Sequence, residues 1–237
     1  KKFYQKTKIQ MTASKYLVFD SGPIINMALN GMLPILEKLR KEFKGEFLIT
    51  KEVKSEIIDY PLTIRRYELE AMQIKDLFDR GIIKHADITN EQVDLLREKR
   101  EEIISVANSL LHSKNDNIHL LDKGECATLA LASILKEPLL IVVDERTTRM
   151  LCENPENLRK LMERKLHTSI KSRKEDYGFF KRFKIIRSAE LIYMACKRNL
   201  FDIKDPKILE AALYGLKYKG CSISEQEIDE IKRCKKL

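Results

Sequence analysis

The chain has 237 residues, of which 43% are hydrophobic and 34% are charged, and its net charge is +9. This length suits one elaborated domain, and no uninterrupted apolar run approaches the roughly 20 residues that a membrane-spanning helix needs. The five cysteines are odd in number and never spaced as C-x-x-C, which argues against a zinc site or a disulfide framework. The basic start, KKFYQKTKIQ, lacks the apolar core of a signal peptide, so we expect a cytoplasmic protein with no membrane partner.

The first 60 residues predict strands that alternate with helices. Residues 16–19 form a β-branched and aromatic run typical of a buried strand, and an apolar helical stretch follows from Ser21. After a second helix, the run EFLIT predicts another strand, and Thr50 is placed to cap the helix KEVKSEIIDY. Asp20 therefore lies at a corner between a strand and a helix.

Two glutamates on the third helix could face the sheet edge. Glu52 and Glu56 are four residues apart and share a helix face. Because Glu56 lies beside the apolar Val53 and Ile57, we expect Glu56 to point inward.

Residues 64–111 have a helical, heavily charged pattern that is interrupted by a short candidate strand, GIIKHAD, and a polar loop, SKNDN, follows. The small-residue helix GECATLALASIL comes next and carries Glu125 in its first turn. The strand LLIVVD follows directly and ends at Asp144. A strand, a small-residue helix and a strand ending in Asp together predict a doubly wound α/β fold.

The last third begins with a basic segment, residues 159–184, which contains ten basic and three acidic residues. Aromatic residues that could stack on bases interleave with these cations, namely Tyr177, Phe179, Phe180 and Phe183. The alternative is an ordinary solvated basic helix and loop. A short strand, FKIIRS, and three helices complete the chain, and Ser224 with Glu227 predicts a capping box for the last helix.

Four carboxylates lie at strand ends or in the first turns of the following helices: Asp20, Glu56, Glu125 and Asp144. Open parallel sheets collect their ligands at this edge. Like charges brought together there need a cation or bound protons, and oxygen-only ligands favour Mg²⁺ or Mn²⁺ over zinc. Each residue also has a simpler explanation, such as capping a helix or complementing its dipole.

The order of these acids resembles the PIN domain, the nuclease fold of VapC-type toxins and several RNA-processing factors. The phrases FDSGPIINMALNGML, GECATLALA and VVDERTTRM look most like a little-characterised prokaryotic branch of PIN-like proteins. The resemblance implies a three-layer fold with a central, mainly parallel sheet flanked by helices. It also implies one domain over residues 16–237, with a helical insertion at about 61–119, a basic insertion at about 153–183, C-terminal helices and an N-terminal extension, 1–15.

Carried over by position, the resemblance implies that Asp20, Glu56, Glu125 and Asp144 ligate a metal that activates water. Ser21 would orient a ligand or water. Many PIN domains have Asp where Glu125 stands, and some have a further acid where this chain has Thr147. Asp122, one helical turn before Glu125, is therefore an auxiliary candidate ligand, and Thr147 is a candidate orienting residue.

Other enzyme classes fit the sequence less well. The run YLVFDSG is similar to the nucleophile strand of haloacid-dehalogenase-like phosphatases, but Gly22 replaces the second Asp that those enzymes need. No Gly-rich nucleotide loop and no serine nucleophile elbow is present.

The sequence thus predicts a Mg²⁺- or Mn²⁺-dependent PIN-type endoribonuclease that hydrolyses RNA phosphodiester bonds. The candidate RNA-binding residues are Arg146, Arg149, Lys171, Arg173, Lys174, Lys181 and Arg182. The alternative is a catalytically silent PIN-like module that binds RNA or a protein. A homodimer or a protein partner, such as an antitoxin, is implied by the resemblance alone.

Overall fold

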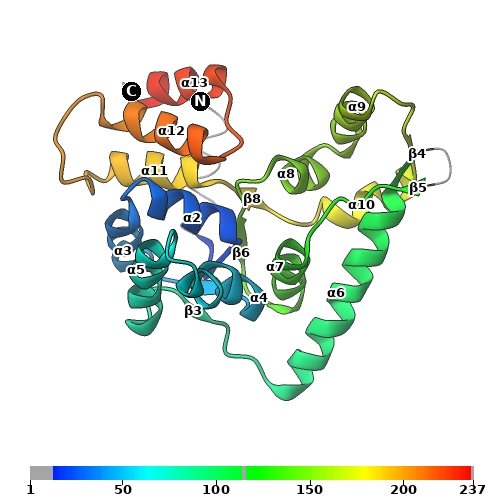
Figure 1. The fold of residues 1–237 in the computed structure, drawn as a ribbon, viewed down its shortest axis with the longest axis horizontal. Coiled ribbons are helices and arrows are strands. Elements are labelled where there is room, and N and C mark those ends of the chain that lie inside the picture. The colour runs from blue at the N-terminus through cyan, green and yellow to red at the C-terminus, as the bar shows by residue number, and fades with distance from the viewer. Residues whose placement is uncertain (1–12, 114–115, 236–237) are drawn as a thin grey trace.

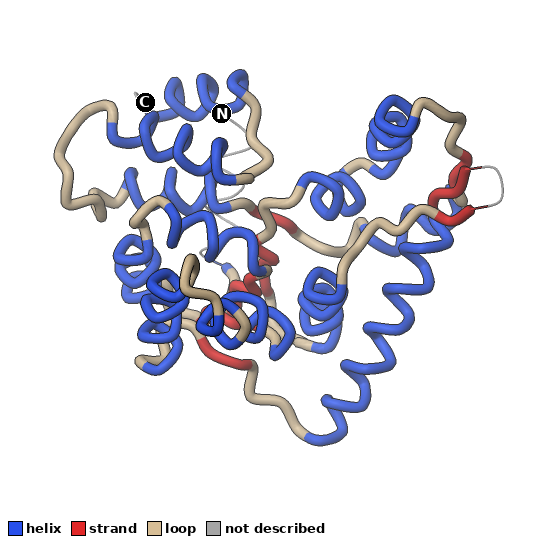
Figure 2. The backbone as a smooth tube through the Cα atoms, in the orientation of Figure 1, coloured by secondary structure: helices blue, strands red, loops and turns tan. Residues whose placement is uncertain are grey.

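The computed structural model describes residues 13–113 and 116–235, so most of the predicted N-terminal extension lies outside the described residues. A five-stranded sheet forms the centre in the order β3-β2-β1-β6-β8, and every neighbouring pair is parallel. Its short strands are β1 (Tyr16–Phe19), β2 (Glu46–Ile49), β3 (Lys84–His85), β6 (Leu139–Val142) and β8 (Ile185–Ile186). Figure 2 shows these strands between layers of helix. The predicted α/β fold is confirmed.

Alternate strand residues face opposite layers, as the two-residue period of a strand requires. Leu17 and Phe19 of β1 belong to one buried cluster, whereas Val18 packs with Leu131 in another. Both faces of the sheet are therefore covered, which explains why its strands read as continuous apolar runs.

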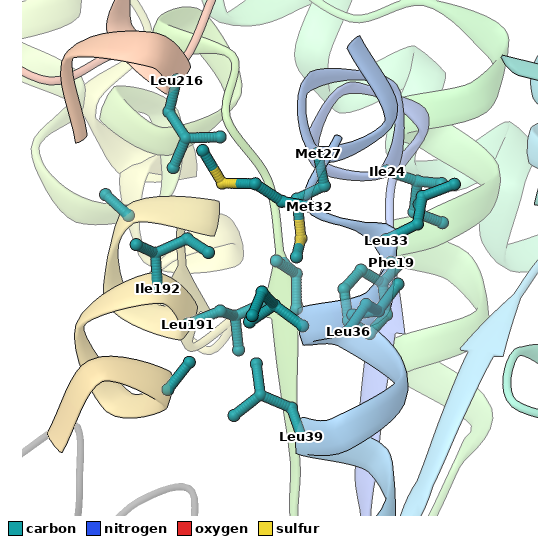
Figure 3. Close-up of a cluster of buried hydrophobic side chains, with 14 of the residues drawn as sticks. Phe19, Ile24, Met27, Met32, Leu33, Leu36, Leu39, Leu191, Ile192 and Leu216 are labelled. Carbon is teal, nitrogen blue, oxygen red and sulfur yellow. The ribbon is translucent and has the colours of Figure 1, made fainter. Parts of the chain in front are cut away.

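The first layer is built by helices from both ends of the chain. Figure 3 shows Leu36 next to Phe19 of β1, with Ile192 and Leu216, from two other helices, on the other side of the same buried cluster. The helices that contribute to this buried cluster include α2 (Ser21–Leu29), α3 (Leu33–Glu42), α5 (Glu68–Asp79), α11 (Ser188–Lys197), α12 (Ile208–Lys219) and α13 (Glu225–Lys235).

The second layer contains α6 (Asn90–Leu110) and α7 (Lys123–Ile134), and α7 packs against β1 and β6. Beyond them lie α8 (Arg146–Glu153), α9 (Pro155–Leu166) and α10 (Tyr177–Phe180). Figure 1 shows α6, α9 and α10 on the opposite side of the molecule from α3 and α11.

A second, small sheet was not predicted from the sequence. Its strands are β4 (Leu111–Ser113), β5 (Asp116–Asn117) and β7 (Lys171–Ser172), and β4 pairs antiparallel with both neighbours. These strands have only two or three residues and no alternating apolar pattern. Part of the predicted polar loop SKNDN is therefore strand, and the pairing of β4 with β7 joins the end of α6 to the basic segment.

The helix predicted over KEVKSEIIDY has two parts. It begins as α4 (Lys51–Lys54), with the Thr50 hydroxyl accepting a 3.2 Å hydrogen bond from the Val53 N–H, so the predicted cap is confirmed. It continues as a π-helical turn, Ser55–Asp59, in which the Tyr60 N–H donates to the Ser55 carbonyl at 2.9 Å. A 3₁₀ turn, Pro61–Thr63, follows.

The predicted capping box of the last helix is confirmed as well, because the Ser224 hydroxyl accepts from the Glu227 N–H at 3.2 Å. Within the described residues, no helix combines the length and the apolar character that crossing a membrane requires.

Candidate active site

Asp20 and Asp144 lie at the same edge of the central sheet. They follow β1 and β6, which are neighbouring parallel strands with Phe19 paired to Val142. The Asp20 N–H donates a 3.0 Å hydrogen bond to the Val142 carbonyl, which extends the ladder to the point where the two chains turn away. Both side chains are buried, with exposed fractions of 4% and 2%.

The π-helical turn presents Glu56 to this edge. The Ser21 hydroxyl, next to Asp20, donates a 3.0 Å hydrogen bond to Glu56 Oε1. Glu52 instead pairs with Arg100 at 2.9 Å, which supports the expectation that Glu56 is the glutamate that faces the site. π-helical turns are rare and often occur at functional sites, because the extra residue redirects side chains on the helix.

Asp122 and Glu125 form a capping box at the start of α7. Asp122 Oδ1 accepts from the Glu125 N–H at 2.7 Å, and Glu125 Oε2 accepts from the Asp122 N–H at 2.8 Å. The other oxygen of Glu125, Oε1, accepts a hydrogen bond from the buried Thr148 hydroxyl of α8. Capping thus explains part of this acidic pair, but within the described residues no hydrogen bond involves Asp122 Oδ2.

Gly124 lies where three of these acids meet. A Cβ atom added at this position would lie 3.1 Å from Glu56 Oε2, 3.4 Å from Asp122 Oδ1 and 4.0 Å from Asp20 Oδ1. Carboxylates from three separate elements therefore surround one small space, which a side chain at position 124 would occupy. Within the described residues, no group of three acid, His or Cys side chains is close enough to constitute a formed metal site.

The cluster of Asp20, Glu56, Asp122 and Glu125, hereafter the acid cluster, has unusual electrostatics. Burial, followed by the charges of Glu125 and Asp122, raises the pKa of Asp20 to about 8. Burial raises the pKa of Glu125 to about 7, although Thr148 opposes the shift. The pKa of Glu56 is also raised, chiefly by burial, with the Ser21 hydrogen bond opposing it.

No Lys or Arg forms an ion pair with the acid cluster within the described residues. Its negative charge must therefore be balanced by protons or by a bound cation. The donors are all oxygens, which suits a hard divalent ion such as Mg²⁺ or Mn²⁺.

Asp144 has a different environment from Asp20. Its Oδ1 accepts from the Ser188 N–H at 2.8 Å, and its Oδ2 accepts from the Ser188 hydroxyl at 2.6 Å and from Asn26 Nδ2 at 2.7 Å. Its backbone carbonyl accepts from the Ser222 N–H at 3.0 Å. Asp144 therefore joins the end of β6 to α2, α11 and the loop before α13.

Comparison with known families supports the fold. A family model described as a PIN domain matches residues 16–156, which is more than half of the chain and includes every acid described above. The chain belongs to the PIN domain family. Searches of curated proteins and of solved structures found no match.

A PIN domain is a nuclease-type fold, and PIN domains typically use divalent metal ions. The predicted relation to the VapC-type branch and the predicted insertion boundaries stay predictions. The match ends at residue 156, before the basic segment and the C-terminal helices.

The other predicted site residues near Asp144 are Thr147, Arg149 and Arg146, and they differ in their surroundings. The Thr147 hydroxyl donates to Glu145 at 3.2 Å, and the neighbouring Thr148 is the threonine that reaches the acid cluster. Arg149 has a side chain only 16% exposed and lies 3.5 Å from Glu227, so it is engaged within the protein. Arg146, in contrast, is exposed and lines a cavity of about 510 Å³ together with Arg164 and Lys165 of α9.

The basic segment, which follows the matched residues, is largely exposed. Lys171, Lys174 and Lys181 are exposed and form no ion pair within the described residues, whereas Arg173 lies within 3.7 Å of Glu175 and Asp176. The Arg182 guanidinium lies over the Phe179 and Phe183 rings, 4.4 and 4.9 Å from their centroids.

The prediction that the interleaved aromatics stack on bases is wrong for two of them. Phe180 and Phe183 are buried in the cluster formed with α6, α7 and α8. Tyr177 is half-buried, and its hydroxyl donates to Glu156 at 3.1 Å. These rings anchor the segment to this buried cluster.

Sequence reasoning missed Asn26, Ser188 and Thr148, the residues that hold the carboxylates in place. Each is a buried polar residue of a helix: Asn26 of α2, Ser188 of α11 and Thr148 of α8. The sequence does carry a signal for Asn26, since it is a polar residue on the apolar face of α2. A buried amide without a hydrogen-bond partner would be costly, so its position indicates a polar partner. Ser188 and Thr148 carry no comparable signal, since both lie in the first turns of helices, where such residues are common.

Proposed function

We propose that this PIN domain is a Mg²⁺- or Mn²⁺-dependent endoribonuclease. The observation that carries the proposal is the acid cluster around Gly124, in which three carboxylates from separate elements surround one space without a compensating cation. Membership of the PIN family supports a nuclease, and the basic surface supports a polyanionic substrate.

The acid cluster is proposed to hold the metal ion through Asp20, Glu56 and Asp122, with Glu125 as the remaining oxygen donor. When bound, the divalent ion supplies water activation and stabilises the charge that develops on the phosphodiester. Ser21 holds Glu56 in place, and Thr148 holds Glu125. Such supporting hydrogen bonds keep carboxylates in the orientation that a ligand set requires.

Asp144 was predicted to be a metal ligand, and its role stays a proposal. Its two oxygens accept three hydrogen bonds from Asn26 and Ser188, which favours a positioning role. In that role it would fix α2, whose first turn contains Ser21, against the end of β6. Metal binding by the Asp144→Asn variant separates a ligand from a positioning residue.

RNA is proposed to approach along the exposed cations of α8, α9 and the basic segment. Arg146 follows closely after Asp144 and shares a cavity with Arg164 and Lys165. This cavity is the basic surface nearest in sequence to the acidic edge. A phosphate backbone extending from the acid cluster would find these cations beside it.

The test is cleavage of a labelled RNA by the full chain with Mn²⁺ or Mg²⁺, compared with the same reaction in EDTA. Asp20→Asn should reduce single-turnover cleavage by on the order of 10²–10³-fold or more, because it removes a charge that would hold the cation. Asp94→Asn is the matched control, since Asp94 lies on α6 with a side chain 75% exposed.

Three results would contradict the nuclease: no cleavage by the wild-type chain, cleavage that persists in EDTA, or equal activity of the two variants. RNA binding without cleavage would instead favour the alternative, a PIN-like module that binds RNA without cutting it. A homodimer or a protein partner stays a prediction in either case.

A further inference from the structure

A largely apolar cavity opens directly beside the acid cluster. Its volume is about 380 Å³, within the range of about 300–1,000 Å³ that is typical of small-ligand sites. Glu56 lines it and also belongs to the acid cluster, so the two sites share one carboxylate. The other lining residues come from α2, the π-helical turn, α5 and the segment that joins the last two, and they include Ile57, Tyr60, Tyr67 and Glu70.

The two tyrosines of this cavity are unusually exposed. Tyr60 is 66% exposed and Tyr67 is 43% exposed, although each has an apolar ring that could pack against the protein. Tyr60 immediately follows the π-helical turn that carries Glu56, so the same backbone irregularity positions the carboxylate and the ring. Two exposed rings at one cavity form a local apolar patch, and such patches mark candidate binding sites.

The polar groups at this cavity are few. No hydrogen bond or ion pair within the described residues involves the Glu70 carboxylate. Arg65 and Arg66 lie between the lining residues Ile64 and Tyr67, are exposed and form no ion pair within the described part of the chain. The Arg66 guanidinium lies 5.4 Å from the Tyr67 ring centroid. The cavity therefore combines apolar walls, two rings and two carboxylates, Glu56 and Glu70, and two exposed arginines lie on the chain segment beside it.

We propose that this cavity binds one unpaired nucleobase of the RNA, next to the phosphodiester held at the acid cluster. A planar base would stack on the Tyr60 or Tyr67 ring, while Arg65 and Arg66 contact the flanking phosphates. This proposal rests on the proposed nuclease function. It also requires single-stranded RNA at the cleavage site, because a base within a duplex could not enter the cavity.

A nucleobase fits these observations better than a protein segment. The cavity holds a single small group, and its shared carboxylate, Glu56, joins it to the site of the reaction. The two unpaired arginines beside it also match the charge of a nucleic acid backbone.

Glu70 makes the proposal more specific. A carboxylate accepts hydrogen bonds and donates none, so it favours bases with an exocyclic amino group, namely adenine, cytosine and guanine. Uracil presents two carbonyl oxygens around a single N–H and should be disfavoured. Cleavage is therefore expected beside amino-bearing bases, and Glu70→Gln should weaken that preference, because its side chain both donates and accepts.

The decisive experiment combines a change in the protein with a change in the RNA. Cleavage sites of the wild-type chain are mapped first, and the base beside the cut is then replaced by an abasic ribose. Removing the base should slow wild-type cleavage by about 5- to 150-fold, the range expected for losing one base stack. In the Tyr60→Ala variant the intact and abasic RNAs should be cut at similar rates, and Tyr60→Phe should restore the difference.

Tyr218→Ala is the matched control, because Tyr218 is 76% exposed and lies on α12, away from the cavity. This variant should respond to the abasic RNA as the wild type does. If Tyr60→Ala and Tyr218→Ala respond equally, the base site is overturned and the cavity is left for a protein partner.

A binding measurement keeps this proposal separate from the nuclease. In EDTA, fluorescence anisotropy is measured with labelled oligoadenylate, oligocytidylate and oligouridylate. Tyr60→Ala should weaken binding of the first two relative to Tyr218→Ala, with a smaller effect on oligouridylate. That result together with no cleavage would overturn the nuclease alone, whereas equal binding by both variants together with normal cleavage would overturn the base site alone.

Discussion

Asp20 and Asp144 end neighbouring strands of one sheet, yet their environments are opposite. Asp20 is buried beside other carboxylates, and its pKa rises to about 8. Asp144 is equally buried but accepts three hydrogen bonds from Asn26 and Ser188. At the end of β1, several acids lie together without a basic partner among the described residues. At the end of β6, hydrogen-bond donors stabilise the Asp144 carboxylate.

This difference shows that position on a sheet edge does not by itself determine what a carboxylate does. Helices α11 and α2 bring hydrogen-bond donors to Asp144, whereas α7 and the π-helical turn bring further acids to Asp20. The uncompensated end is suited to bind a cation, and the satisfied end is suited to hold elements together.

The largest expected effect is on the free energy of unfolding, which should respond differently to substitution of Asp144 and of Asp20. Asp144→Ala leaves three buried donors without an acceptor, so the free energy of unfolding should fall by about 3–5 kcal/mol. Asp20→Asn should leave it unchanged or raise it, because a buried charge is removed. Urea unfolding of the metal-free proteins at pH 8 measures both. Equal destabilisation by the two substitutions would contradict the comparison.

A Mn²⁺ titration of Asp144→Asn sharpens the same comparison. If Asp144 is a positioning residue, the variant should bind Mn²⁺ with an affinity within about 10–100-fold of the wild type, as for supporting residues of metal sites. Complete loss of binding, with folding preserved by circular dichroism, would make Asp144 a ligand.

The raised pKa values predict how metal-free stability depends on pH. Unfolded carboxyls titrate near pH 4, whereas Asp20 and Glu125 titrate at about 8 and 7 in the folded chain. Between pH 4 and pH 8 the folded state therefore holds more protons, so its free energy of unfolding decreases as the pH rises. The decrease attributable to the cluster should be about 1–3 kcal/mol, since its members share protons.

The measured quantity is the stability difference between wild type and Asp20→Asn in EDTA, at pH 5.5 and at pH 8.5. The variant should gain relative to the wild type at the higher pH, and Mn²⁺ should restore the wild type by binding only its folded state. A difference that does not change with pH would indicate that the acid cluster is not under electrostatic stress.

The smallest expected effect is on the salt dependence of RNA binding by the basic segment. Unlike the acid cluster, this segment is largely exposed. Reversing the charges of Lys171, Arg173 and Lys174 should make the plot of log affinity for RNA against log salt shallower by about 2–3, because phosphate contacts are lost. Equivalent reversals on α3, α5 and α6 serve as the control, at Lys41, Lys75 and Lys99. An unchanged slope would remove the basic segment from the RNA site.

Local sequence signals predicted much of the fold. The strands at residues 16–19, 46–49 and 139–142 are apolar and β-branched, and strands of a sheet covered on both faces must be so. The Ser224 capping box was predicted because it depends on residues three apart. The β4-β5-β7 sheet was not, since it joins segments some 60 residues apart through strands without a pattern.

The same distinction between local signals and distant contacts applies to the candidate site. The sequence by itself determined which acids follow the strands, because parallel strands place their ends at one edge. Only the tertiary structure decided which of these acids lie close to other acids and which one accepts hydrogen bonds from buried donors. The donors and the neighbouring acids come from segments that are distant in the sequence. Ser188 lies 44 residues beyond Asp144, and Asp122 lies 66 residues beyond Glu56. Their arrangement depends on packing of the whole core, which no local pattern encodes.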